Sequence, residues 1–190
     1  MPSSDVLPAT APVTARRQLR VAKLAALIQA GAVVWIATVL AQTALFWGSG
    51  DTVRAVYGRK LGIDLSATPA ADHALAAVLV AVVAGFGILV AVQVWRLAAT
   101  YRRGGAFTVE AAVGLRRLAI AGALTLGVDI VVRHVVVPIL TLHLAGGPRF
   151  AGPWLISQDL LYGVMVLFLF ALSGIFHAAA EMADDHAAIV

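Results

Sequence analysis

One stretch of the chain, residues 122–143, is apolar enough to cross a lipid bilayer and yet carries Asp129, Arg133, His134 and Pro138 in its middle. A charged group at the centre of a bilayer costs roughly 2.5 to 3.5 kcal/mol on insertion scales, so it persists where it faces protein or water and has a partner. Asp129 and Arg133 are four residues apart, about one helical turn, so each can be the partner of the other. The stretch therefore predicts a membrane helix whose charged face is turned toward the rest of the protein.

The composition of the whole chain supports the same class of protein. Of its 190 residues, 61% are hydrophobic and 13% are charged, whereas roughly a quarter of the residues are charged in soluble domains. A chain of this length has room for about four spans of ~20 to 25 residues. We predict an all-α integral membrane protein, a bundle of four transmembrane helices at about residues 24–47, 74–99, 118–144 and 155–177.

The same pattern sets the domain organisation. Residues 1–15 are rich in Pro, Ser, Thr and Ala without a hydrophobic period, which predicts a disordered cytoplasmic tail. Residues 16–190 are then a single membrane domain. Within it, residues 48–73 form the longest connection, and Val53, Val56, Tyr57 and Lys60 fall at helical spacing there. A short amphipathic helix on the membrane surface and an ordinary polar loop both remain open for this segment.

Lysine and arginine residues are distributed unequally between the two sides of the predicted bundle. Nine of them fall near the N-terminus and the connection between spans two and three: Arg16, Arg17, Arg20, Lys23, Arg96, Arg102, Arg103, Arg116 and Arg117. The positive-inside bias places this side, and with it both termini, in the cytoplasm. The net charge of +4 then reflects orientation and contact with anionic lipid, and we expect no direct binding of nucleic acid.

Several chemistries are excluded or disfavoured by what the chain lacks. There is no cysteine, which excludes thiolate catalysis and cysteine-ligated zinc or iron–sulfur centres. We find no phosphate-binding loop, nucleophile triad or paired acid–base carboxylates, so we predict neither an enzyme nor a cofactor. His134 and His143 are nine residues apart and lie on opposite sides of a helix, so we predict no metal site.

The polar residues of the outer half are candidates for a small pocket that opens outward. Its predicted members are Gln42, Asp129, Arg133, His134, Asp159 and Tyr162, with His143 and Gln158 nearby. Arg133 can pair with Asp129 or with Asp159. The functional interpretation is a site for an ion, a proton or an anionic ligand, and the structural interpretation is a buried pair that fixes helix register.

Two other features suggest contacts outside the chain. Arg102, Arg103, Arg116 and Arg117 form a basic cluster that can dock an acidic partner, the acidic tail of the same chain, or lipid headgroups. The small residues Ala77, Ala81 and Gly85 repeat every four positions, which allows close approach of helices and possible self-association.

The segment YRRGGAFTVEAAVGLRRL, residues 101–118, resembles a motif of a bacterial family of four-span membrane proteins catalogued as domain of unknown function 2975. In that motif Gly, any residue, Phe, Thr, any residue and Glu are followed by Leu-Arg-Arg. The end of the chain is similar too, with Phe176, Glu181, Asp184 and Asp185 before a final hydrophobic pair. The resemblance implies a protein often encoded beside a small helix-turn-helix regulator, and it transfers no catalytic residues.

Two functional hypotheses follow, both for a multi-pass protein of the bacterial inner membrane. In the first, the protein is a non-enzymatic sensor or regulatory partner of a cytoplasmic helix-turn-helix regulator, with the outward-facing polar pocket as its input. In the second, it is a small oligomeric channel or transporter that uses the Asp129 and Arg133 pair.

Overall fold

The computed structural model describes residues 11–103, 108–150 and 152–188, and it describes side chains within residues 20–182 of those ranges. The described chain contains five helices and no strand: α1 Ala11–Trp47, α2 Gly50–Leu61, α3 Ala70–Arg102, α4 Val109–Thr141 and α5 Ser157–Ala188. Four of them are long and apolar enough to cross a membrane: α1, α3, α4 and α5. The all-α, four-span prediction is therefore confirmed, and the protein is a multi-pass membrane protein in contact with lipid.

Each of the four expected ranges overlaps one of these helices, but the bounds differ: α4 ends at Thr141 and not at 144, and α5 begins at Ser157 and not at 155. The candidate spans are Arg20–Trp47, Ala70–Arg102, Val109–Thr141 and Ser157–Met182. Most of the predicted disordered tail, residues 1–10, lies outside the described residues, and α1 already begins at Ala11.

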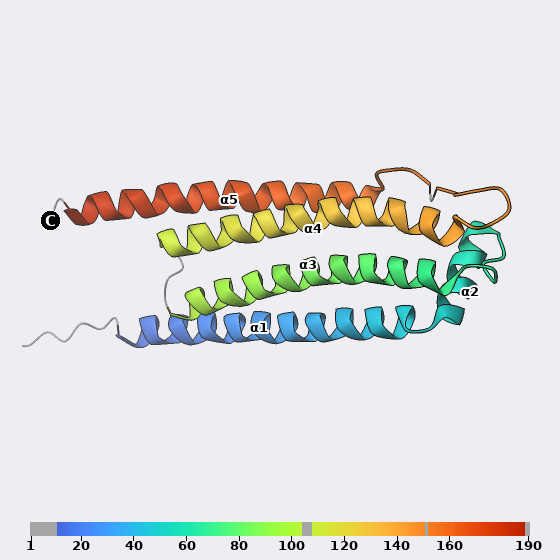
Figure 1. The fold of residues 1–190 in the computed structure, drawn as a ribbon. Coiled ribbons are helices and arrows are strands. Elements are labelled where there is room, and N and C mark those ends of the chain that lie inside the picture. The colour runs from blue at the N-terminus through green and yellow to red at the C-terminus, as the bar shows by residue number, and fades with distance from the viewer. Residues whose placement is uncertain (1–10, 104–107, 151, 189–190) are drawn as a thin grey trace, which may run out of the picture.

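The long helices lie side by side in chain order (Figure 1). Helix α1 packs on α3, α3 on α4, and α4 on α5. Helix α5 therefore has α4 as its main helical neighbour, and most of its surface is left for lipid or another protein. The beginning of α1 and the end of α5 lie at one end of the molecule, together with the end of α3 and the start of α4, and α2 lies at the other (Figure 1).

Helix α2 confirms the short-helix alternative for residues 48–73. Ser49 accepts a hydrogen bond from the Thr52 amide at its N-terminus, and Gly62 takes a positive φ of 65° at its C-terminus. Val53 is fully buried and joins a cluster of apolar side chains from four helices: Trp47, Val53, Ala76, Val132, Val136 and Leu140. Helix α2 therefore closes this end of the helix layer through Val53 and the partly buried Tyr57, while its other side carries charged residues.

The turn between α3 and α4 agrees with the sequence where it is described. The Thr108 hydroxyl accepts a hydrogen bond from the Ala111 amide, and Glu110 lies in the first turn of α4.

Candidate functional site

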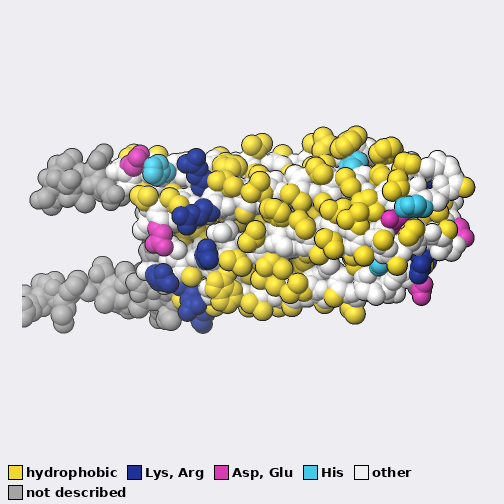
Figure 2. All heavy atoms as spheres, in the orientation of Figure 1, with side chains coloured by type: hydrophobic (Ala, Val, Ile, Leu, Met, Phe, Trp, Pro, Cys, Tyr) yellow, Lys and Arg dark blue, Asp and Glu magenta, His cyan; other side chains and the backbone are white. Residues whose placement is uncertain are grey.

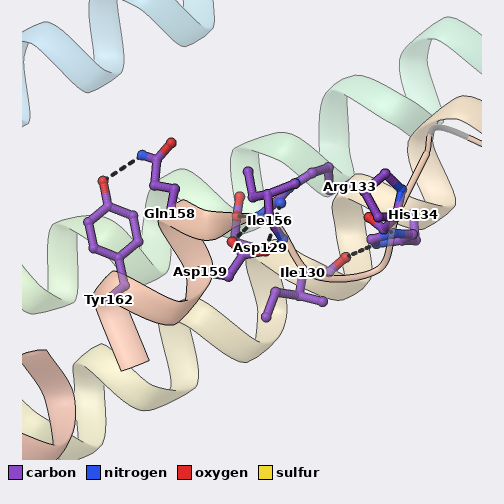
Figure 3. Close-up of polar contacts among 9 residues, drawn as sticks. Asp129, Ile130, Arg133, His134, Ile156, Gln158, Asp159 and Tyr162 are labelled. Atoms are coloured by element: carbon purple, nitrogen blue, oxygen red, sulfur yellow. Dashed lines mark hydrogen bonds and ion pairs between the residues drawn. The ribbon is translucent and has the colours of Figure 1, made fainter. Parts of the chain in front are cut away.

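Three charged side chains meet where α5 begins (Figure 3). The guanidinium of Arg133 donates to both carboxylate oxygens of Asp159, from Nη1 to Oδ2 over 3.1 Å and from Nη2 to Oδ1 over 2.8 Å. The same Nη2 also donates to Asp129, one turn back on α4. Paired contacts of this kind are the strongest arrangement of arginine and carboxylate. The sequence left open whether Arg133 pairs with Asp129 or with Asp159, and in the structure it pairs with both.

Asp159 is fixed from a second direction. Its Oδ2 accepts a hydrogen bond of 2.9 Å from the amide of Ile156, the residue before α5. A side chain in the first turn that reaches back to this amide satisfies one of the donors that a helix start leaves unpaired. Asp159 is only 3% exposed, so this carboxylate is buried, paired and used structurally.

Asp129 differs from Asp159 in its environment. Its side chain is 45% exposed, against 2% for that of Asp159. Counted at their usual charges, the three groups give one positive and two negative charges, so the cluster has an excess of one negative charge. Asp129 is the member that is open to its surroundings and therefore the one that another group can reach.

The chain between α4 and α5 folds back along α4. Helix α4 ends at Thr141, whereas α5 begins beside Arg133, eight residues earlier on α4 and about 12 Å along its axis at 1.5 Å per residue. The last two turns of α4 are thus flanked by non-helical chain. Such chain is tolerated at membrane depth only where protein groups or water satisfy its backbone.

Buried polar side chains supply those partners. Thr141 is fully buried, and its hydroxyl accepts a hydrogen bond of 2.9 Å from the Arg149 amide. His134 is 5% exposed; its Nε2 lies 3.2 Å from the carbonyl oxygen of Pro153, and its Nδ1 lies 2.7 Å from that of Ile130. Its ring also stacks on Trp154, with centroids 4.3 Å apart. His134, Thr141 and Asp159 together hold the returning chain, which we call the return loop (residues 142–156).

A cavity of about 450 Å³ lies between the return loop and α4. Its walls are apolar apart from His134 and include Val131, Val135 and Ile139 of α4 and Phe150 and Trp154 of the return loop. Of the predicted pocket members, His134 borders this cavity, whereas Arg133 and Asp159 bond to one another beside it. The outward-facing polar pocket stays a prediction.

The remaining predicted members lie elsewhere. Gln42 is exposed on α1, whose main long-helix neighbour is α3, and it borders a different hollow with Phe46 and Thr52. Tyr162 is 49% exposed, and its hydroxyl accepts a hydrogen bond of 2.8 Å from Gln158. His143 lies at the end of the helix layer.

A side-chain contact at that end was not foreseen from the sequence. His143 Nδ1 lies 2.6 Å from Asp72 Oδ2 at the start of α3. The two residues are 71 positions apart, so periodicity gives no signal for the contact. It ties the end of α4 to the start of α3, next to the contact between His73 and the Trp47 carbonyl at 2.9 Å.

The basic cluster divides into two kinds of residue. Arg102 donates to the buried Gln29 side chain over 2.8 Å, so it joins α3 to α1. Arg103, Arg116 and Arg117 are exposed. Figure 2 shows lysine and arginine side chains gathered near the end of the molecule where the chain begins and ends. Three of the four predicted contact residues are therefore available to an external partner or to lipid.

Comparison with known proteins gives one match. The family model described as "Protein of unknown function (DUF2975)" matches residues 63–190, which includes α3, α4 and α5 with the charge cluster and the return loop. No curated protein and no solved structure matches the chain. The match covers more than half of the chain, so this four-span membrane protein belongs to the DUF2975 family.

Proposed function

We propose that the protein is a non-enzymatic signal-transducing protein of the bacterial inner membrane. In this account the charge cluster of Asp129, Arg133 and Asp159 is the input, and the opposite ends of α4 and α5 are the output. The observation that carries the proposal is the paired contact from Arg133 to Asp159, at 3.1 and 2.8 Å, because it joins the start of α5 to α4.

The packing of α5 makes this contact suitable for transmission. Among the described long helices α5 packs mainly on α4, so its position in the bundle depends on this one contact surface. Small residues line the α4–α5 contact: a Cβ added at Gly122 would come within 3.2 Å of Val166. If the contact between Arg133 and Asp159 breaks or lengthens, we therefore expect α5 to move as a rigid rod, so that its far end is displaced as well.

The charge excess indicates the chemical class of the input. A cation or a proton that neutralises Asp129 removes one uncompensated charge from the spanning region, where such a charge is costly. The input is therefore a small cation, a proton or a cationic group of a ligand, arriving from the outer side.

The output is proposed to act on a cytoplasmic regulator. Arg103, Arg116 and Arg117 are exposed at the end of the molecule where the chain begins and ends. Glu181, Asp184 and Asp185 follow on the last turns of α5. Basic and acidic groups at this end suit a soluble protein partner, such as the helix-turn-helix regulator implied by the family resemblance.

The first test is native mass spectrometry of the tagged protein extracted gently from its own host. Co-purification of a small soluble DNA-binding polypeptide is expected, and Arg103→Gln with Arg117→Gln should weaken it. The matched control is Arg54→Gln with Arg59→Gln at the opposite end, which should leave it unchanged. Loss of the polypeptide in the control but not in the test variant would exclude this output surface.

The same chain permits a direct test of orientation because it contains no cysteine. A single cysteine at Ser66 should react with an impermeant maleimide in intact cells, and one at Arg103 should react only after the membrane is opened. The reverse pattern would place the charge cluster in the cytoplasmic half and overturn the proposed input.

A second candidate function is a channel or transporter built from several copies. The half-exposed Asp129 side chain beside Arg133 favours it, since a conduction pathway needs a reachable charge. In this case Asp129→Asn abolishes flux in liposomes. In the signalling account Asp129→Asn changes the response to the input, and liposomes show no flux with either protein.

A further inference from the structure

A second site lies at the other end of the α4–α5 contact, away from the charge cluster. It is a cavity of about 370 Å³, and its walls come from the first turns of α4 and the later turns of α5. The lining residues are Ala112, Val113, Arg116, Phe170, Ser173, Gly174 and His177. The signalling account uses Arg116 as an exposed charge but gives the cavity itself no role.

Small side chains open the cavity between the two helices. Ala112 is 2% exposed, and the Ser173 hydroxyl donates to its carbonyl oxygen over 2.9 Å, which fixes the distance between α4 and α5. A Cβ added at Gly174 would meet nothing within 4 Å. The floor is therefore a fixed apolar trough, and Val113 and Phe170 extend it along the lipid-facing surface.

The rim of the trough is cationic. Arg116 borders it, and within the part of the chain that the structure describes no acidic side chain pairs with this guanidinium. His177 stands on the α5 side, where its Nε2 lies 3.4 Å from Glu181 Oε1. Glu181 is one turn further along α5 and is 65% exposed. Glu181 thus contacts His177 on its own helix, and among the described side chains Arg116 is left without an ion pair.

The location decides which anion fits. Arg116 and Arg117 stand directly before the long apolar run of α4 that starts at Leu118, and basic residues next to such a run are suited to lipid headgroups. A headgroup phosphate can reach Arg116 while its acyl chain follows the apolar trough beside Val113 and Phe170. A free phosphate would use the arginine but leave the trough empty.

We propose that this cavity is a binding site for one anionic phospholipid, with Arg116 on the phosphate and an acyl chain between α4 and α5. Arg116 provides charge recognition, and Gly174 provides the space for the chain.

The test uses the full chain in nanodiscs of phosphatidylcholine that contain phosphatidylglycerol. The protein is released from the nanodisc, and native mass spectrometry measures which lipid remains bound to it. The wild-type protein should retain one phosphatidylglycerol. Arg116→Gln should lower this retention about fivefold, in line with the contribution of one basic residue at a membrane surface. Arg117→Gln removes the same charge from the next position and serves as the matched control, with retention near that of the wild type.

A second pair of variants tests the trough without changing any charge. Gly174→Leu fills it and should lower retention as Arg116→Gln does, whereas Gly127→Leu, also free of contacts within 4 Å, should not. Equal losses of phosphatidylglycerol retention in Arg116→Gln and Arg117→Gln would overturn the proposal, because they would show that general electrostatic attraction, and not this cavity, holds the lipid. Binding of inorganic phosphate that depends on Arg116 and is indifferent to Gly174→Leu would overturn the lipid in favour of a free anion.

Discussion

Arg133 and Asp159 lie 26 positions apart in the chain and are joined by two nearly parallel hydrogen bonds, which fasten the start of α5 to α4. The same carboxylate accepts the amide of Ile156. One buried aspartate therefore both caps a membrane helix and locks it to its neighbour.

The two aspartates of the cluster should respond very differently to neutralisation. Asp159→Asn removes the buried charge partner of Arg133, and loss of one member of a buried pair costs up to roughly 3 to 5 kcal/mol, an upper bound here because Asp129 still pairs with Arg133. Asp129→Asn keeps the paired contact and removes the excess charge, so we expect at most a small change. Unfolding by denaturant in mixed micelles measures both free energies. Equal losses in the two variants would show that Arg133 does not discriminate between the carboxylates.

The return loop should be released when its buried partners are removed. Thr141→Val deletes the acceptor of the Arg149 amide, and an unpaired buried group costs about 1 to 3 kcal/mol. Amide hydrogen exchange in residues 145–156 should accelerate while α3 stays protected. Thr38→Val is the matched control, because the Thr38 hydroxyl is exposed and bonds only within its own helix. Unchanged exchange in Thr141→Val would mean that other contacts hold the return loop.

Glycine is required at Gly58 but not at Gly85. A Cβ at Gly58 would lie 2.8 Å from the backbone oxygen of Ile63, so the chain leaving α2 would have to move. We expect Gly58→Ala to cost roughly 1 to 3 kcal/mol, as overpacking generally does. A Cβ at Gly85 meets nothing within 4 Å, and Gly85→Ala should stabilise α3 by roughly 0.5 to 1 kcal/mol. Thermal unfolding compares the two, and a stable Gly58→Ala protein would contradict the close approach.

Alkaline pH should loosen α2 through Tyr57. Burial raises the pKa of the Tyr57 phenol above its ordinary value of 10.0, and its ring packs 6.0 Å from that of Trp47. Because the folded pKa is the higher one, the neutral phenol stabilises the fold fully below the unfolded value, and this contribution is lost as pH rises through the folded value. Thermal unfolding at pH values from below 10 upward should show a decline that Tyr57→Phe reduces. An identical decline in Tyr57→Phe would assign the effect to other groups.

The sequence predicts the membrane helices well because hydrophobicity alone specifies them. Spans of about 20 apolar residues have few alternatives in a bilayer, and the Thr108 cap marks the start of α4 correctly. The pairing of Asp129 with Arg133 was also accessible, since both lie on one helix at a spacing of one turn.

What the sequence could not provide was the relation between helices. The contact from Arg133 to Asp159 depends on where α5 starts relative to α4, and the length of a loop does not tell whether it runs outward or folds back. His134 was predicted as a pocket member and Thr141 was given no role, and the contacts of both with the return loop depend on how that loop folds back. Gln42 was grouped with the pocket because of its position along α1. In the structure α3 and α4 lie between α1 and α5, so Gln42 is far from Asp159.

The central claim is that Arg133 and Asp159 set the position of α5 along its whole length. Spin labels at Arg117→Cys and Ala178→Cys, in a chain with no native cysteine, report the distance between the far ends of α4 and α5 by electron–electron double resonance. We predict that Asp159→Asn shifts or broadens this distance distribution in nanodiscs, while Asp64→Asn, in the connection between α2 and α3, leaves it unchanged. An Asp159→Asn protein that remains folded with an unaltered distribution would contradict the claim.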